Sequence, residues 1–149
     1  MNASLSYREA AVQGASPVRL TILLYQQAIE DVRRALAAQQ QGDIEGRTQE
    51  INHALLVVGY LQATIDKEQG GQVANNLERF YEQVRSGLIE AQFRQSEALL
   101  EQQISHLMLV HEAWREVEYA TSNASSGDTT PPIGAAGAEL TAPPTEWKA

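Results

Sequence analysis

Apolar residues recur every three or four positions along four stretches of the first 119 residues. This spacing places them on one side of an α-helix. Ala, Leu, Gln, Glu and Arg dominate the same stretches, which favours helix throughout. The pattern predicts helices over residues 17–40, 44–67, 72–93 and 97–119. Their near-equal lengths and short connections predict an all-α fold, an antiparallel four-helix bundle.

Four groups of helix-capping or helix-breaking residues set these boundaries. Ser16-Pro17 supplies an N-cap followed by proline at the first helical position. Gln41-Gly42-Asp43 ends one helix and caps the next, and Gly70-Gly71 is expected to separate the second helix from the third. Ser96 caps the last helix, and Glu97 complements its dipole.

Each predicted helix carries one apolar stripe that should face the core. The expected core residues are Leu20, Leu24, Ala28, Val32, Ala35 and Leu36 in the first helix and Ile44, Ile51, Ala54, Leu55, Val58, Leu61 and Ile65 in the second. The third contributes Val73, Leu77, Phe80, Tyr81, Val84, Leu88 and Ala91, and the fourth Leu99, Leu100, Ile104, Leu107, Val110, Trp114 and Val117. Together they are enough for a single continuous core.

The second predicted helix has more apolar residues than one stripe needs. Leu56, Val57 and Tyr60 project from the side opposite its core stripe, and Ile89 and Met108 lie off the stripes of the third and fourth helices. Scattered exposed apolar residues are normal on protein surfaces. Three such residues within five positions instead indicate a clustered binding groove, because a helix that is apolar all round must bury its second side against something.

The composition changes sharply after Tyr119. Residues 120–149 hold four of the five prolines and a run rich in Ser and Gly. Such a segment buries too little apolar surface to offset the entropy lost on ordering. We therefore expect an N-terminal arm over residues 1–15, a bundle domain over 16–119 and a disordered tail over 120–149.

Charge and cysteine content narrow the possible functions. Lys and Arg number 11 against 19 Asp and Glu, so the net charge is −8, which disfavours nucleic acid as a partner. Cysteine is absent, which excludes disulfides, thiolate zinc sites and cysteine nucleophiles. No apolar run approaches the ~20 residues of a membrane span. The start of the chain does not resemble a secretory signal, so a cytosolic location is expected.

Catalytic and metal-binding motifs are incomplete. Glu50 and His53 have the Glu-x-x-His spacing of di-iron bundles, but those sites need a second such motif. Neither His106 nor His111 has a glutamate three positions earlier. Phosphate-binding glycine loops and nucleophile motifs are also missing. We expect no enzyme, no metal and no cofactor, and His53 is expected to be solvated or to line the groove.

The order of several short motifs resembles the flagellar secretion chaperone family FliS over about residues 5–118. The motifs are Ser16-Pro17, Leu24-Tyr25, Ala28-Ile29, Gly42-Asp43, Ile51-Asn52-His53-Ala54, Ile65-Asp66, Gly70-Gly71, Ala74-Asn75-Asn76-Leu77, Phe80-Tyr81, Leu88, Ala91 and Trp114. Ile65 stands where the family usually has Leu, and the tail lies outside the pattern.

The resemblance implies a cytosolic export chaperone that binds the disordered C-terminal segment of flagellin. Such a chaperone prevents early polymerisation and keeps flagellin competent for flagellar type III export, with a component of the export gate as a further partner. The client-binding residues expected here are Leu56, Val57, Tyr60, Asn52, Ile89 and Met108. An N-terminal arm carrying Leu5 and Tyr7 is expected to cover part of the groove. The alternative is a structural bundle that buries its second apolar side in a homodimer and has no client.

Overall fold

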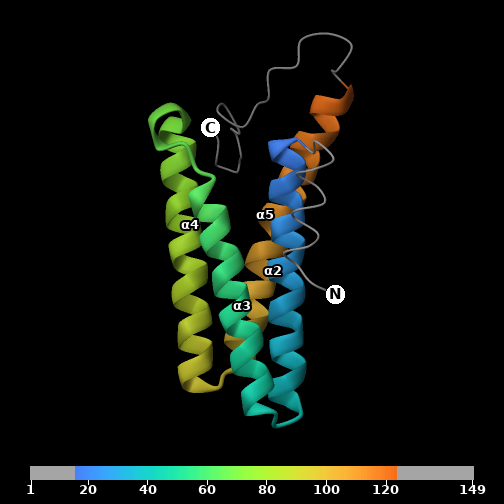
Figure 1. Cartoon of the computed structure of the whole chain (residues 1–149), viewed down its shortest axis with the longest axis vertical. Coiled ribbons are helices and arrows are strands. Elements are labelled where there is room, and N and C mark those ends of the chain that lie inside the picture. The colour runs from blue at the N-terminus through green and yellow to red at the C-terminus, as the bar shows by residue number, and fades with distance from the viewer. Residues whose placement is uncertain (1–15, 124–149) are drawn as a thin grey trace.

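The computed structural model describes residues 16–123, which form four helices. They are α2 (Pro17–Gln40), α3 (Ile44–Ala63), α4 (Lys67–Arg94) and α5 (Glu97–Asn123). The helices run side by side, with α2 packed between α3 and α5 and with α4 packed on the other sides of the same two helices (Figure 1). The predicted all-α, antiparallel four-helix bundle is confirmed.

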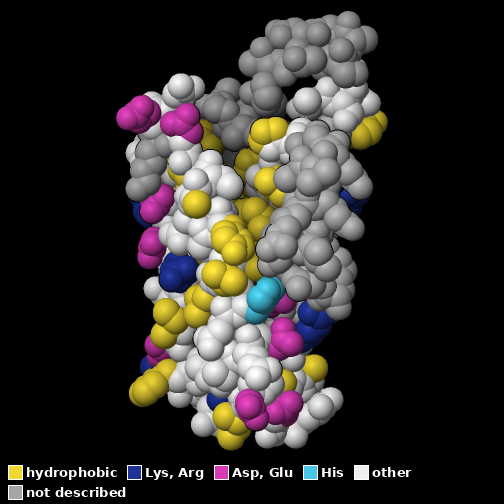
Figure 2. Space-filling model, viewed as in Figure 1, with side chains coloured by type: hydrophobic (Ala, Val, Ile, Leu, Met, Phe, Trp, Pro, Cys, Tyr) yellow, Lys and Arg dark blue, Asp and Glu magenta, His cyan; other side chains and the backbone are white. Residues whose placement is uncertain are grey.

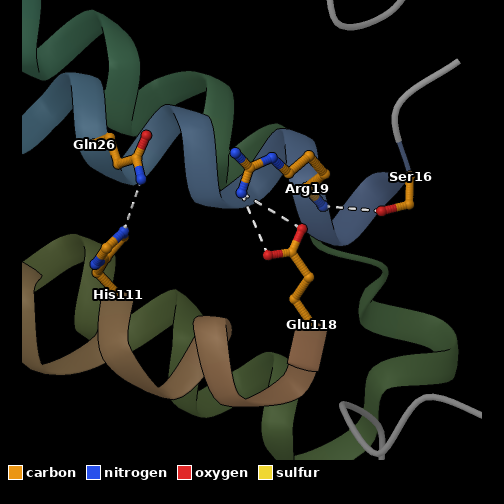
Figure 3. A network of polar contacts seen from close by, with 5 residues as sticks. All are labelled: Ser16, Arg19, Gln26, His111 and Glu118. Atoms are coloured by element: carbon orange, nitrogen blue, oxygen red, sulfur yellow. Dashed lines mark hydrogen bonds and ion pairs between the residues drawn. The ribbon is translucent and has the colours of Figure 1, made fainter. Parts of the chain in front are cut away.

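Two polar contacts show the antiparallel register of α2 and α5. Arg19 Nη1 lies 3.3 Å from Glu118 Oε1, and Gln26 Nε2 lies 3.3 Å from His111 Nε2 (Figure 3). Residue numbers rise along α2 as they fall along α5, so the two helices run in opposite directions. The ion pair is exposed to solvent and therefore contributes little to stability.

Three of the four predicted helix starts have the capping geometry that the sequence indicates. Ser16 Oγ accepts a hydrogen bond from Arg19 N at 3.1 Å, and Asp43 Oδ1 accepts one from Gly46 N at 2.9 Å. Gly42 takes a φ of +75°, which glycine adopts without steric cost. Ser96 Oγ accepts from Leu99 N at 3.1 Å. Each cap satisfies an N–H that would otherwise lack a partner.

The turn predicted at Gly70-Gly71 is wrong. Helix α3 ends at Ala63 rather than at residue 67, and the chain reverses over residues 64–66. Asp66 starts α4 by accepting hydrogen bonds from Glu68 N and Gln69 N, both at 3.2 Å. Gly71 (φ +57°, ψ −134°) interrupts α4 after its first turn. An N-cap carboxylate thus begins the helix, and the glycine kinks it.

The last helix is longer than predicted. α5 continues to Asn123 rather than ending at residue 119. The four additional residues include neither proline nor glycine, and the first glycine after Tyr119 is Gly127. No strong helix breaker therefore stops the helix at the expected place.

The core consists mainly of the predicted stripes. Its fully buried residues include Val32 and Ala35 of α2, Ile51 of α3, Leu88 of α4 and Leu107 of α5. Ile44, an expected core residue, is instead 59% exposed at the start of α3. The expectation that Val57 projects away from the core is also wrong, because Val57 is completely buried. Val57 follows His53 by one helical turn, and His53 contacts Asp31 of α2, so this side of α3 faces α2.

Candidate binding surface

Large apolar side chains are exposed on α3 and α4. Their exposed fractions are 51% for Leu56, 43% for Tyr60, 55% for Ile89 and 85% for Phe93. We call these four residues the apolar band. Figure 2 shows hydrophobic side chains gathered along α3 and continuing towards the outer edge of α4. Exposed apolar side chains that gather in this way are typical of a binding surface.

The register of α3 and α4 brings the two halves of the band together. Arg85 Nη1 donates to the carbonyl oxygen of Leu55 at 3.3 Å, and Gln92 Nε2 donates to Thr48 Oγ1 at 2.6 Å. Ile89 lies between these two contacts on α4, level with the turn of α3 between Asn52 and Leu56. Three of the predicted client-binding residues, Asn52, Leu56 and Ile89, therefore share one surface. Asn52 is exposed at its margin.

Met108 lies on a different side of the bundle. It is 45% exposed on α5, and Arg33 Nη2 of α2 donates to its sulfur at 3.3 Å. α5 packs mainly on α2 and α4, so this edge is separated from the apolar band by the width of the bundle. The six predicted client-binding residues thus do not form one groove. Leu5 and Tyr7, predicted to cover it, lie outside the described residues.

Phe93 belongs to the band although the sequence analysis did not select it. It follows Ile89 by one helical turn, and four-residue spacing places both on the same side of α4. An apolar pair at this spacing, outside the core stripe, was the signal available in the sequence. It was weaker than the run in the second helix because its two members are separated by three polar or small residues.

A buried carboxyl group lies beside the apolar band, at the seam between α2 and α3. The side chain of Asp31 is 1% exposed, and its Oδ2 is 2.5 Å from His53 Nδ1. Gln27 Nε2 donates to Asp31 Oδ1 at 2.8 Å. Burial raises the pKa of the Asp31 carboxyl, and hydrogen bonds from His53 and Gln27 partly offset that effect. His53 is thus anchored on one edge rather than simply solvated.

Several stripe residues of α4 and α5 are only half-buried towards the end of the bundle that contains the α3–α4 connection. On α4 and α5, the residues Val84, Leu88 and Leu107 are fully buried. Towards the α3–α4 end, the stripe residues that are only half-buried are Val73, Leu77, Phe80, Val110, Trp114 and Val117. Leu77, Phe80, Val110 and Trp114 among them pack against the buried core.

The hydroxyl groups of Tyr25 and Tyr81 form a buried hydrogen bond next to these half-buried residues. Tyr25 Oη donates to Tyr81 Oη at 2.9 Å, and the Phe80 and Tyr81 rings pack with centroids 5.7 Å apart. Burial is the main reason that the pKa of Tyr25 is raised well above its usual value. Both hydroxyls therefore stay protonated, and the pair serves packing rather than proton transfer.

The part of the chain between residues 16 and 123 shows no arrangement suited to metal chemistry. Within it, no three His, Asp or Glu side chains lie close enough together to hold a metal ion. None of the described helices combines the length and apolar character that crossing a membrane requires.

The fold and the surface define a class of protein, a four-helix bundle with large apolar side chains exposed on two neighbouring helices. The family described as "Flagellar protein FliS" matches residues 1–121. The chain therefore belongs to the FliS family of flagellar secretion chaperones, as the motif order predicted. This is a family of chaperones, which are not enzymes.

Three relatives named as flagellar secretion chaperones support this assignment. The flagellar secretion chaperone FliSB of Pseudomonas aeruginosa is 32% identical over 111 residues, which cover 74% of this chain and 88% of the relative. The flagellar secretion chaperone FliS of Salmonella typhimurium is 30% identical over 110 residues, covering 73% and 82%. That of Campylobacter jejuni is 30% identical over 112 residues, covering 75% and 86%.

Proposed function

We propose that this protein binds the C-terminal segment of flagellin in the cytosol before export. The segment is held in a form that cannot polymerise and that remains competent for flagellar type III secretion. The observation that carries the proposal is the apolar band of Leu56, Tyr60, Ile89 and Phe93, exposed on the surface of a flagellar secretion chaperone. The chaperone family favours this function over a structural homodimer without a client.

The spacing of the band suits an amphipathic helix or an extended segment as its occupant. Two pairs of residues one turn apart, Leu56 with Tyr60 and Ile89 with Phe93, lie on neighbouring helices. A partner helix can lay its apolar stripe across such a surface. The separate position of Met108 supports a client long enough to continue around the bundle onto α5. A long segment of this kind gains contacts without a deep pocket.

Covering apolar residues of flagellin explains both effects of the chaperone. Filament assembly needs the same apolar residues of the segment, so their burial against the bundle blocks polymerisation. Fully burying an apolar side chain contributes roughly 1.5–3 kcal/mol. The four band residues are already partly buried, so their gain is about half of that, or roughly 3–6 kcal/mol in total. Ordering the client offsets part of this gain, which keeps the complex reversible.

The test is the substitution Leu56→Glu. A carboxylate at this position must be desolvated when the client binds, at a cost of several kcal/mol. We expect the affinity for a peptide of the flagellin C-terminal segment to fall by about a hundredfold or more, as measured by isothermal titration calorimetry. Because Leu56 is exposed, the unfolding free energy should change by less than about 0.5 kcal/mol.

Leu109→Glu is the matched control. Leu109 is also an exposed leucine, but it lies on α5 and outside the apolar band. Its replacement should leave the affinity near that of the wild type. Equal affinities for the wild type and Leu56→Glu would show that the apolar band is not the client surface. A wild-type protein that does not bind the peptide at all would overturn the proposed function.

A further inference from the structure

His53 is the one described histidine that is both anchored on a buried carboxyl group and adjacent to the apolar band. Its Nδ1 contacts Asp31 Oδ2, while 36% of its side chain remains exposed. Leu56 follows His53 by three positions on α3, so the two side chains are neighbours on the helix surface. Figure 2 shows a histidine side chain at the surface beside the hydrophobic side chains over α3.

The contact with Asp31 fixes which edge of the imidazole faces a partner. A carboxylate accepts hydrogen bonds, so the Nδ1 facing it carries a proton. Nε2 lies on the opposite edge of the ring and is directed away from the buried Asp31. When the ring is charged, Nε2 also carries a proton and is a donor. When the ring is neutral, Nε2 is an acceptor.

We propose that His53, oriented by Asp31, is a specificity-determining residue of the client surface that donates a hydrogen bond from Nε2 to an oxygen of the bound segment. This inference rests on the proposed flagellin-binding function. The apolar band supplies most of the contact area, but apolar contacts do little to fix the orientation of the bound segment. A charged donor at its edge fixes how the segment lies, because it must meet an oxygen atom.

Charged groups on both helices surround the contact between Asp31 and His53. On α2, Arg34 Nη1 lies 4.0 Å from Asp31 Oδ1, and Arg34 Nε also pairs with Glu30 Oε2 at 3.5 Å. On α3, Glu50 lies one turn before His53. As a general rule, carboxylates and guanidinium groups keep their charges between pH 6 and 8, whereas imidazole changes its charge in this range.

Client affinity should therefore fall as pH rises. Loss of the Nε2 proton turns a donor into an acceptor, and its lone pair then faces the client's oxygen. A hydrogen bond with a charged partner is worth enough to change the affinity by about tenfold or more. The effect should saturate once His53 is neutral, because the apolar contacts do not depend on pH.

The experiment measures the dissociation constant of the flagellin C-terminal peptide at several values between pH 6 and 8. Wild-type protein should bind about tenfold more weakly at pH 8 than at pH 6. His53→Gln should bind with a nearly constant affinity. Titrations of the peptide itself occur with both proteins and cancel in the comparison. Circular dichroism establishes that both proteins stay folded over this range.

His106→Gln is the matched control, because His106 is an exposed histidine on α5. It should keep the full pH dependence of the wild type. Asp31→Asn should weaken the dependence, because an amide no longer stabilises the charged ring. A pH-independent wild-type affinity, or an unchanged dependence in His53→Gln, would overturn the role of His53 while leaving the flagellin-binding function intact. Absence of binding at every pH would overturn both.

Discussion

The two ends of the bundle are built differently. At the end with the α2–α3 connection, Arg47 is buried and joins three helices. Its Nε donates to Gln92 Oε1 of α4 at 3.0 Å, and its Nη1 donates to Gln39 Oε1 of α2. At the end with the α3–α4 connection, Gly71 kinks α4, and Trp114 is only half-buried. The first end is held by the buried contacts of a charged side chain, and the second has the neutral Tyr25–Tyr81 pair beside half-buried apolar residues.

This difference concerns how the two ends are held together, since apolar side chains are exposed at the α2–α3 end as well, where Phe93 is 85% exposed. A chaperone without a client must hold a defined fold and still expose apolar surface. Buried polar groups with satisfied hydrogen bonds favour one arrangement of the helices at the α2–α3 end. The α3–α4 end can then keep incompletely buried side chains without loss of the fold. Stability and binding should therefore respond differently to equal truncations at the two ends.

The largest expected effect comes from a pair of Leu→Ala substitutions. Leu100, towards the α2–α3 end of α5, is completely buried, whereas Leu77, towards the α3–α4 end of α4, is half-buried. Leu100→Ala should lower the unfolding free energy by about 3 kcal/mol, because it leaves a cavity in the core. Leu77→Ala should lower it by about 1 kcal/mol, since solvent already reaches the side chain. Urea denaturation measures both values.

The same two variants separate stability from binding. Leu77→Ala should weaken binding of the flagellin peptide, and Leu100→Ala should not do so while the protein remains folded. Similar losses of stability in the two variants would show that the ends are equally well packed. In that case the partial exposure of Leu77 would not reduce its contribution to the unfolding free energy.

The sequence predicted the regular part of this asymmetric bundle well. Helix starts at Ser16, Asp43 and Ser96 follow from local capping chemistry, which needs no knowledge of distant residues. The apolar stripes could also be predicted, because helical periodicity is a local property of the sequence. The predicted position of the second turn was wrong because the sequence offers two local signals, an N-cap residue at Asp66 and the pair Gly70-Gly71. The helix begins after Asp66, and the glycine pair lies inside it.

Tertiary packing decided what the sequence could not. Val57 is buried because α2 lies against that side of α3. The local sequence pattern does not predict how much of the α3 surface α2 covers. The buried Asp31 and Arg47 have partners 22 and 45 residues away along the chain, namely His53 and Gln92. In the candidate site, Leu56, Tyr60 and Ile89 were correctly placed at the surface. Their continuity depends on the register of α3 and α4, which only the packed bundle reveals.

A smaller effect is expected where α4 packs on α5. The amide of Gln103 occupies the space that a Cβ atom at Gly87 would fill, and Gln103 is 3% exposed. Gly87→Ala should lower the unfolding free energy by about 1–2 kcal/mol, because the buried amide must move. Gly59→Ala is the control, since its Cβ would meet only Arg85 Nη1, at 4.0 Å. That change should stabilise the helix by about 0.5–1 kcal/mol.

A double variant tests whether the Gln103 amide causes the loss. Gly87→Ala combined with Gln103→Ala should cost less than the sum of the two single substitutions, because the shortened side chain no longer competes with the new methyl group. Additive costs would mean that the two residues do not interact. The loss caused by Gly87→Ala would then have another origin, and the Gln103 amide would not limit how closely α4 and α5 approach.

The smallest effect is expected from shortening the chain at the α3–α4 end of the bundle. Removing residues 124–149 should change neither the unfolding free energy nor the affinity for the flagellin peptide, because the segment is rich in proline, glycine and serine. Removing residues 120–149 also deletes the last turn of α5, where Thr121 is half-buried and Ala120 is exposed. Its cost should stay within about 0.5 kcal/mol, the range for surface changes. Thermal melting of the two truncated proteins beside the full chain measures both steps. A loss of several degrees on removing residues 124–149 alone would show that this segment packs against the bundle, and the contrast between the two ends would then have to include it.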